Sequence, residues 1–485
     1  MKRMITWILV LTLVFALFGC AGGEVEQTNP YAGKEVEDTG FSVGFGQVNI
    51  TPMDYSVPIG GYGNTSNRMS KGFINYLYTT CIAMTDKDGN TILLFNNDLQ
   101  ETRTDMLDEL RKAINEATGV PMDNIMISAT HTHSGPDLGN TAHKTILNYR
   151  SWLPGWMAEA AKQAMADRKP AELRIGTTTC PDLNFIRHYL LSDGSYIGSN
   201  FGDDTGKTYV GPATQIDNTM QLLRFVRKDA QDILLMNWQT HPTRVGGDTL
   251  MKPDLASDIV GVLRETCEKE LDCKAIYVLG AAGDVNCRGN MESEVIPEDY
   301  IAHGEALAKY AIEAYDSLEK VETGTLEVMT AEWTGKIDHS EDHLIDEARL
   351  IASLEKSSGN NKMLVEEASK YGINSAYHAR GIINKYGQGE SNTQPLFAFR
   401  LGKIAFALAP YEMFTDNGRY IKENSPFEMT FIVTCANGGY GYMPTAKAYD
   451  YHCYEANTCR YERGAGDMLA EEYLKLLQQL YSAEG

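Results

Sequence analysis

Short apolar runs alternate with longer amphipathic stretches along most of the chain, from Phe41 onward. Six apolar runs bounded by turn-forming residues predict buried strands, at residues 91–95, 124–129, 233–238, 275–279, 396–408 and 429–434. Four stretches with apolar residues at helical spacing predict helices, at residues 104–117, 258–271, 303–318 and 464–480. This alternation predicts an α/β (α+β) fold, in which layered central β-sheets are flanked by helices.

The organisation of the chain points to one large domain. A chain of 485 residues has room for about three average domains, but no repeat period and no proline-rich linker divides residues 39–485. The segment 338–385 is rich in charged residues and has a helical pattern, so we expect a helical insertion there. We therefore predict a single domain over residues 39–485.

The first residues have the pattern of an export signal. Two basic residues precede an apolar run at 5–18, which is too short to span a bilayer comfortably but suits a signal-peptide core. The run ends in Leu-Phe-Gly-Cys, which resembles a bacterial lipobox, so residues 1–20 are predicted to be a lipoprotein signal peptide with lipidation at Cys20. Residues 21–38 are then a polar tether. A plain cleaved signal peptide or an uncleaved anchor are the alternatives.

All three possibilities for the N-terminal segment predict the same location. Each places the remainder of the chain outside the cytoplasm, either lipid-anchored to a bacterial membrane or secreted or periplasmic. The net charge of −22 disfavours electrostatic adhesion to anionic lipids, so membrane proximity would come from the lipid on Cys20. The same charge argues against nucleic-acid binding, because a phosphate backbone needs a basic patch to displace its counterions.

Eight cysteines remain besides Cys20. An even number in an exported chain permits disulfides, and Cys267 with Cys273 and Cys453 with Cys459 are candidate local pairs. Free buried thiols are the alternative, because spacing alone does not fix connectivity.

Residues with metal-binding and acid–base chemistry follow several of the predicted strands. Thr130-His131-Thr132-His133-Ser134-Gly135-Pro136 comes directly after the run 124–129. In an extended backbone residues two apart face the same side, so His131 and His133 are able to point into one pocket. Neutral imidazole is a common zinc ligand. A hydrogen-bonded polar pair is the alternative explanation for this motif on its own.

Four further motifs follow apolar strands. His241 comes after the run 233–238, and a turn of small residues ending in Asp284-Val285-Asn286 comes after the run 275–279. Glu412 follows the run 396–408, where burial of a carboxylate is costly without a metal or a cation. A glycine- and tyrosine-rich turn that includes Tyr442 comes last. Each motif alone also fits packing or hydrogen bonding.

In this order along the chain, the five motifs resemble the catalytic domain of the zinc-dependent neutral or alkaline non-lysosomal ceramidases, the neutral ceramidase family. The resemblance runs from about residue 44 to residue 480, and the stretch 130–136 is its most specific part. It implies one Zn²⁺ per chain, held by His131, His241, Glu412 and Tyr442.

The resemblance also implies the catalytic residues. His133 takes the place of the family histidine beside the metal-bound water, and Tyr454 that of a tyrosine twelve residues beyond the zinc tyrosine. The active-site arginine falls on Arg187.

Two departures from the family pattern bear on the substrate. The family's catalytic serine is replaced by Asn286, which excludes a serine nucleophile there but leaves a hydrogen-bond donor for substrate or oxyanion. The sequence given stops at Gly485, before the family's C-terminal immunoglobulin-like domain would be expected.

The function that the resemblance implies is hydrolysis of an N-acyl amide, ceramide or a related amphipathic N-acyl lipid, to a fatty acid and an amine. Zinc lowers the pKa of its bound water, which would attack the amide carbonyl. Tyr454, Arg187 and Asn286 would stabilise the oxyanion, and His133 would protonate the leaving amine. The alternatives are a hydrolase of a different small amide or ester, and a non-catalytic surface lipoprotein that binds an amphipathic ligand.

Overall fold

A nine-stranded sheet is the largest element of the structure, a computed structural model that describes residues 29–62, 68–199, 201–245, 254–291, 293–358 and 366–483. The strand order is β14-β12-β11-β6-β1-β3-β4-β5, and β16 also pairs with β6. These strands are β1 (Ser42–Asn49), β3 (Tyr78–Thr85), β4 (Thr91–Asn97), β5 (Ile125–Ala129), β6 (Lys169–Thr179), β11 (Thr219–Arg227), β12 (Ile233–Trp238), β14 (Lys274–Leu279) and β16 (Glu319–Val321).

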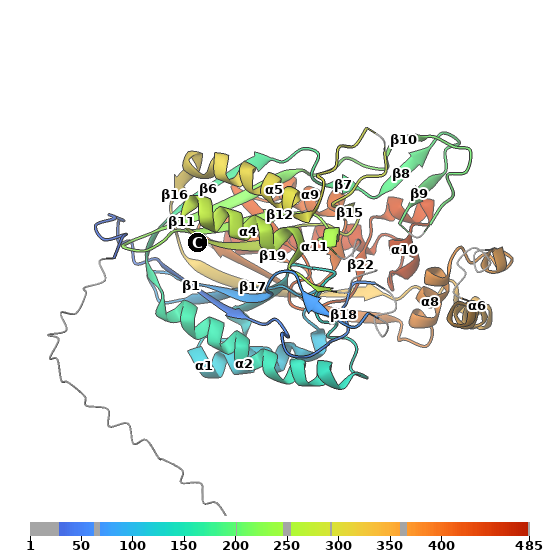
Figure 1. Cartoon of the computed structure of the whole chain (residues 1–485), viewed down its shortest axis with the longest axis horizontal. Coiled ribbons are helices and arrows are strands. Elements are labelled where there is room, and N and C mark those ends of the chain that lie inside the picture. The colour runs from blue at the N-terminus through green and yellow to red at the C-terminus, as the bar shows by residue number, and fades with distance from the viewer. Residues whose placement is uncertain are drawn as a thin grey trace, which may run out of the picture.

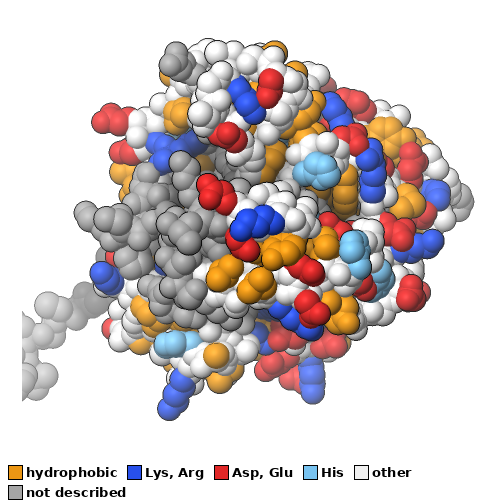
Figure 2. All heavy atoms as spheres, turned by 90° about the vertical axis from the view of Figure 1, so that its right-hand side faces the viewer, with side chains coloured by type: hydrophobic (Ala, Val, Ile, Leu, Met, Phe, Trp, Pro, Cys, Tyr) orange, Lys and Arg blue, Asp and Glu red, His pale blue; other side chains and the backbone are white. Residues whose placement is uncertain are grey.

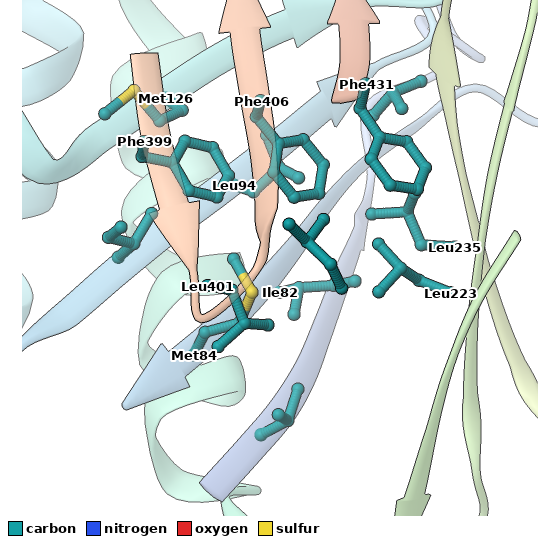
Figure 3. Packing of buried hydrophobic residues seen from close by; sticks show 14 of the residues in the cluster. Ile82, Met84, Leu94, Met126, Leu223, Leu235, Phe399, Leu401, Phe406 and Phe431 are labelled. Carbon is teal, nitrogen blue, oxygen red and sulfur yellow. The ribbon is translucent and has the colours of Figure 1, made fainter. Parts of the chain in front are cut away.

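A four-stranded sheet packs face to face against the first (Figure 1). Its strands, in spatial order, are β17 (Leu326–Lys336), β18 (Ser391–Leu401), β19 (Ile404–Leu408) and β21 (Met429–Val433). Figure 3 shows three of its aromatic side chains lying over aliphatic side chains of the larger sheet. Phe406 stacks on Phe399 at 4.3 Å and on Phe431 at 4.7 Å between ring centroids. This row of rings forms the centre of the core.

Helices cover the outer faces of both sheets. Side chains alternate between the two faces of a strand, so each sheet buries one face in the shared core and the other under helices. The larger sheet is covered by α1 (Leu107–Thr118), α2 (Lys144–Ala166), α4 (Asp258–Leu271) and α5 (Tyr300–Ala314). The smaller sheet is covered by α9 (Thr415–Asn424) and α11 (Ala465–Ser482). The four layers confirm the predicted α/β fold with central sheets flanked by helices.

Short elements extend from these layers around the loops at the strand ends. The short strands are β2 (Gly72–Phe73), β7 (Phe185–Ile186), β8 (His188–Leu191), β9 (Tyr196–Gly198), β10 (Tyr209–Pro212), β13 (Asp254–Leu255), β15 (Val285–Asn286), β20 (Glu412–Met413) and β22 (Tyr442–Met443). The short helical turns are η2 (Thr104–Met106), η3 (Met122–Asn124), η4 (Tyr315–Ser317), η5 (Asp342–Leu344), η6 (Ala446–Tyr451) and α10 (Tyr454–Thr458).

One predicted strand is wrong. The run 396–408 forms two antiparallel strands, β18 and β19, joined by a hairpin at Gly402 and Lys403. Gly402 has φ 58°, a left-handed conformation that glycine adopts without steric cost, and this allows the chain to reverse within an otherwise apolar run. The helix predicted at 303–318 begins earlier, because the Asp299 side chain accepts a hydrogen bond from the backbone N–H of Ala302 and caps α5.

Two helices lie in the described part of the segment 338–385. They are α6 (Ile345–Ser358) and α8 (Ala376–Lys385), which share a small apolar cluster and lie at the right of Figure 1 beside α10. Figure 2 shows acidic, basic and apolar side chains interspersed on the described part of this side of the molecule. The tertiary packing of α8 against α10 brings the segment to the edge of the strand-end loops.

The predicted signal peptide and Cys20 lie outside the described residues. Within the described ranges, no helix is long and apolar enough to cross a membrane. The eight cysteines from Cys81 to Cys459 are all buried and free, so the candidate pairs Cys267–Cys273 and Cys453–Cys459 are not bonded. The Cys273 thiol instead lies 3.7 Å from the carbonyl oxygen of Cys267.

The stacked rings between the sheets predict a large loss of stability on truncation. Phe406→Ala removes a ring that has no exposed surface and leaves a cavity between two sheets, so we expect a loss of about 3–5 kcal/mol in the free energy of unfolding. Denaturant unfolding followed by circular dichroism measures this loss. Val210→Ala, at a side chain that is 59% exposed, is the control and should change stability by less than about 0.5 kcal/mol.

Candidate active site

The loops that carry the predicted site residues meet because the strand ends are joined. Three parallel pairs, β4 with β5, β12 with β14, and β19 with β21, each direct their carboxyl ends to the same edge. The backbone N–H of Thr434, after β21, donates to the carbonyl of Leu279 at the end of β14 (2.9 Å). The N–H of Asn437 donates to the carbonyl of Ile127 in β5 (2.7 Å). The segment after β21 therefore connects the two edge strands, β14 and β5, of the nine-stranded sheet.

A carboxylate lies between two imidazoles at this junction. Glu412 Oε2 is 3.1 Å from His241 Nε2 and 3.3 Å from His131 Nε2. His133 Nε2 lies 3.4 Å from His131 Nε2, and the ligand atoms of the three histidines lie within 4.8 Å of one another. The three histidines are 1–7% exposed. Residues from three separate loops thus present nitrogen and oxygen atoms to one point.

The backbone fixes the orientation of two of these rings. His131 Nδ1 is 2.8 Å from the carbonyl oxygen of Gln100, and His241 Nδ1 is 3.0 Å from the carbonyl oxygen of Val285. A carbonyl only accepts, so each Nδ1 carries a proton and each Nε2 faces Glu412. His131 also has φ 65°, an unfavourable backbone conformation for a non-glycine residue, which persists only because its surroundings hold it there.

The electrostatics of the cluster keep Glu412 ionised and His241 neutral, which are the protonation states that metal binding requires. Burial lowers the pKa of His241 to about 4, and the Arg187 cation contributes to this shift. Burial alone would raise the pKa of Glu412, but His131 and His241 outweigh it and hold that pKa well below its usual range. An ionised carboxylate beside oriented imidazole nitrogens is a ligand set that suits Zn²⁺. These residues therefore fit a divalent metal ion.

The predicted tyrosine ligand lies next to the glutamate. Strands β20 and β22 pair in parallel, with Glu412 opposite Tyr442 in the register. The Tyr442 ring is nearly parallel to the His241 ring, with centroids 6.4 Å apart, and the Arg187 guanidinium lies 5.3 Å from its centroid.

A cavity of about 360 Å³ opens onto the cluster. Its lining residues are Gly61, Tyr62, His133, Arg187, Ser199, His241, Thr243, Asn286, Tyr377, Tyr442 and Tyr454. Six of the eight residues predicted as catalytic or metal-binding are in that set, and the other two, His131 and Glu412, contact lining histidines. The structure thus brings all eight together around one cavity.

Arg187 lies between His241 and Asn286. Its Nη1 lies 3.5 Å from His241 Nε2 and 3.5 Å from Asn286 Oδ1, and its Nη2 donates to the carbonyl of Gly283 (2.6 Å). The pairing of β7 with β15 places Phe185 opposite Asn286, so the strand that leads to Arg187 runs beside the asparagine.

The sequence did not reveal several other residues around the cavity. The edge of the Tyr62 ring packs against His133 with centroids 4.9 Å apart, and Tyr377 packs against Tyr454 at 5.0 Å. Tyr62 lies in the glycine-rich stretch Ile59-Gly60-Gly61-Tyr62-Gly63, which was a usable signal in the sequence. Tyr377 lies on α8 in the charged segment 338–385, where no motif marks it. Glu455, which forms an ion pair with Arg187, is adjacent in sequence to Tyr454.

The site and fold can now be compared with known proteins. Residues 41–281 match the family model described as neutral/alkaline non-lysosomal ceramidase, N-terminal. Over residues 41–281, the chain belongs to the neutral/alkaline non-lysosomal ceramidase family. This confirms the resemblance found in the sequence and makes the protein a ceramidase-like hydrolase.

Solved ceramidase structures share the fold. The chain resembles the crystal structure of neutral ceramidase from Pseudomonas aeruginosa, with a TM-score of 0.69 and 17% identity over 92% of this chain and 75% of that one. A structure described as ceramidase complexed with C2 gives a TM-score of 0.69 and 16% identity over 91% of this chain and 75% of that one. Identities this low support a shared fold, and the chemistry has to be inferred from the site residues of this chain.

The histidine cluster predicts metal binding that depends on its ligands. Purified protein should carry about one divalent ion per chain, and His131→Ala should lose it, because one oriented nitrogen ligand is removed. Elemental analysis by mass spectrometry measures the stoichiometry. His343→Ala, at an exposed histidine in η5, is the control and should keep the ion. Equal metal content in wild type and His131→Ala would contradict the assignment.

Proposed function

We propose that the protein is a zinc-dependent amide hydrolase that cleaves an N-acyl amide, ceramide or a related N-acyl lipid, to a fatty acid and an amine. One observation carries this proposal. The Glu412 carboxylate is held between the Nε2 atoms of His131 and His241, beside a cavity that is lined by His241, Arg187 and Tyr454. Metal ligands and hydrogen-bond donors thus face the same small volume.

The residues that would hold Zn²⁺ are His131, His241, Glu412 and Tyr442. Bound zinc polarises a carbonyl and lowers the pKa of water toward about 7, which is the chemistry that amide hydrolysis needs at neutral pH. The carbonyl oxygens of Gln100 and Val285 keep the two imidazoles in the ligating orientation. Glu412, whose pKa is held below its usual value, supplies the negative charge of the site.

Three side chains are positioned to stabilise the oxyanion. Arg187 keeps its charge throughout the physiological pH range. Burial raises the pKa of Tyr454, so its hydroxyl stays protonated and able to donate. Asn286 directs Oδ1 toward Arg187, which leaves its Nδ2 donor for the substrate. Donors aimed at a developing oxyanion typically contribute about 2.7–4 kcal/mol each.

His133 is the residue proposed to carry the proton. It lines the cavity, and its Nε2 lies next to His131 Nε2. Among the described residues its Nδ1 has no hydrogen-bond partner, although the atom is buried. Burial lowers the pKa of His133, and the neighbouring His131 and His241 lower it further, so the ring is neutral at rest. It would accept a proton from the attacking water as general base and then pass that proton to the leaving amine as general acid.

The cavity also bears on the substrate. Its volume of about 360 Å³ is near the lower end of the usual range for ligand sites, so it holds the amide and adjoining atoms while a long acyl chain extends beyond it. Asn286 supports direct attack by water, because its side-chain amide has no hydroxyl or thiol that the substrate could acylate. A different small amide or ester on the same site is the alternative substrate.

We also propose that the protein is located outside the cytoplasm. The basic residues, apolar run and lipobox-like sequence support an extracytoplasmic lipoprotein anchored to a bacterial membrane through Cys20. This location suits an amphipathic N-acyl substrate, because both would partition to a membrane surface.

Hydrolysis can be tested directly with a panel of N-acyl sphingoid bases and N-acyl amino acids, by following fatty-acid release. Wild type should release fatty acid from at least one panel member, and Glu412→Gln should reduce turnover by at least about 10³-fold, because the anionic metal ligand is lost. His343→Ala should keep wild-type activity. Retained turnover in Glu412→Gln would refute the mechanism.

The same variant separates an enzyme from a binding protein. Glu412→Gln conserves the shape of the side chain, so a non-catalytic lipoprotein would keep its affinity for an N-acyl ligand and show no turnover in wild type either. Absence of release from every sphingoid substrate in wild type would remove the ceramidase-like assignment of substrate while leaving other amides to test.

Anchoring predicts a change of location on mutation of the lipidated cysteine. Cys20→Ala should move the protein from the membrane fraction of a bacterial expression host to a soluble extracytoplasmic fraction, or leave it as an uncleaved precursor of higher mass. Incorporation of labelled palmitate into wild type and its loss in Cys20→Ala measure the modification. Label that remains in the variant would show that a different residue is acylated.

A further inference from the structure

A second buried carboxylate lies beside the cavity and has no part in the steps above. Glu455, on the first turn of α10, has no exposed surface. Its Oε1 is 2.5 Å from Arg187 Nη2, and its Oε2 is 2.8 Å from His188 Nε2. One carboxylate therefore contacts two consecutive residues at the junction of β7 and β8.

This cluster is not a second metal site. Ligand atoms of His188, Cys453 and Glu455 lie within 4.8 Å of one another, which is compatible with a metal on distance alone. Both oxygens of Glu455 are already engaged, and one of them by a cation. Burial raises the pKa of the Cys453 thiol well above its usual value, so the thiolate that a metal would require is disfavoured. The carboxylate instead serves the arginine.

The contacts of the guanidinium show what the ion pair does. Nη2 contacts Glu455 and donates to the carbonyl of Gly283, whereas Nη1 is directed toward His241 and Asn286. An arginine side chain has several rotatable bonds, so contacts to the planar guanidinium are needed to hold that group in one orientation. Glu455 contacts Nη2 of the guanidinium, and Nη1 is left facing His241 and Asn286.

The ion pair also sets the separation of two proposed oxyanion donors. Tyr454 and Glu455 are adjacent on α10, so fixing Glu455 against Arg187 fixes Tyr454 relative to the same arginine. The two segments are far apart in the chain, because His188 and Glu455 are separated by 267 positions in sequence. Tyr454 is further held by ring contacts with Tyr442 (5.5 Å) and Tyr377 (5.0 Å).

We propose that Glu455 is a positioning residue of the active site, which orients the Arg187 guanidinium and registers Tyr454 against it. This inference rests on the proposed function, because it assigns Glu455 the task of placing donors for that reaction. A purely structural role predicts a loss of stability without a specific dependence on Arg187.

A double-mutant cycle distinguishes the two roles. Arg187→Met, Glu455→Gln and the double variant are compared with wild type for kcat and KM on the best substrate of the panel. We expect Glu455→Gln to lower kcat by roughly 10–10²-fold with little change in KM, because a misplaced donor affects the transition state more than substrate binding. The double variant should match Arg187→Met within about 2-fold, since Glu455 acts through Arg187. Losses that multiply in the double variant would overturn the proposal.

A matched variant controls for the removal of a buried carboxylate. Asp232 is also buried and forms an ion pair with Arg224 (2.9 Å), but it lies at the start of β12, at the end of that strand opposite His241. Asp232→Asn should lower the thermal midpoint and leave kcat and KM unchanged. An equal fall of kcat in Asp232→Asn and Glu455→Gln would mean that general destabilisation explains both.

A structural readout keeps this test separate from the proposed function. Crystal structures of wild type and Glu455→Gln should show the Arg187 guanidinium displaced from the carbonyl of Gly283 in the variant. An unmoved guanidinium would refute the positioning role even if the enzyme were active. Absence of hydrolysis by wild type would instead refute the proposed function. If Glu455→Gln does not fold, Glu455→Asp, which keeps the charge on a shorter stem, replaces it in both measurements, with the same expected displacement and a smaller fall in kcat.

Discussion

The site depends on the hydrogen bonds that join the segment after β21 to the ends of β14 and β5. Thr434 and Asn437 each donate a backbone N–H to a carbonyl of the larger sheet, and Ile127 in turn donates to the Asn437 side chain (3.0 Å). Buried backbone groups need partners, so these bonds stabilise the junction of the two sheets as well. The interaction that completes the core is therefore also the one that brings His131, His241 and Glu412 to one point.

The two buried carboxylates of the site show how the same side chain acquires different roles. Glu455 is compensated within the protein, since Arg187 and His188 outweigh the effect of burial and hold its pKa below the usual value. Glu412 lies between two imidazoles, and two carbonyl oxygens orient those rings so that their Nε2 atoms face the carboxylate. The two rings hold the pKa of Glu412 below its usual value, and their Nε2 atoms are also the ones that would bind a metal ion together with the carboxylate. Glu455 is thus paired with a fixed cation, whereas Glu412 belongs to a set of residues that fits a metal ion.

Local patterns predicted those parts of the structure that depend on local sequence. The strands near 91–97 and 233–238 and the helix α4 follow from apolar runs and periodicity bounded by turn residues. The run 396–408 was misjudged because apolar periodicity continues through its hairpin, and only Gly402 marks the reversal. His131 and Glu412 were found because each ends an apolar strand. Tyr377 and the role of Glu455 were not, because their contacts arise from packing between segments distant in the chain.

Asn286 restricts the hydrolytic mechanisms that the site supports. Its place on β15, opposite the strand that leads to Arg187, sets it at the cavity wall with its carbonyl oxygen toward the guanidinium. A carboxamide nitrogen is delocalised into its carbonyl, so Asn286 donates hydrogen bonds but forms no acyl intermediate. The same backbone position that would present a nucleophile therefore presents a donor instead. Arg187 and Tyr454 also supply donors there, so the oxyanion would be stabilised from three segments of the chain. The attacking group would come from water, which favours hydrolysis without an acyl-enzyme intermediate.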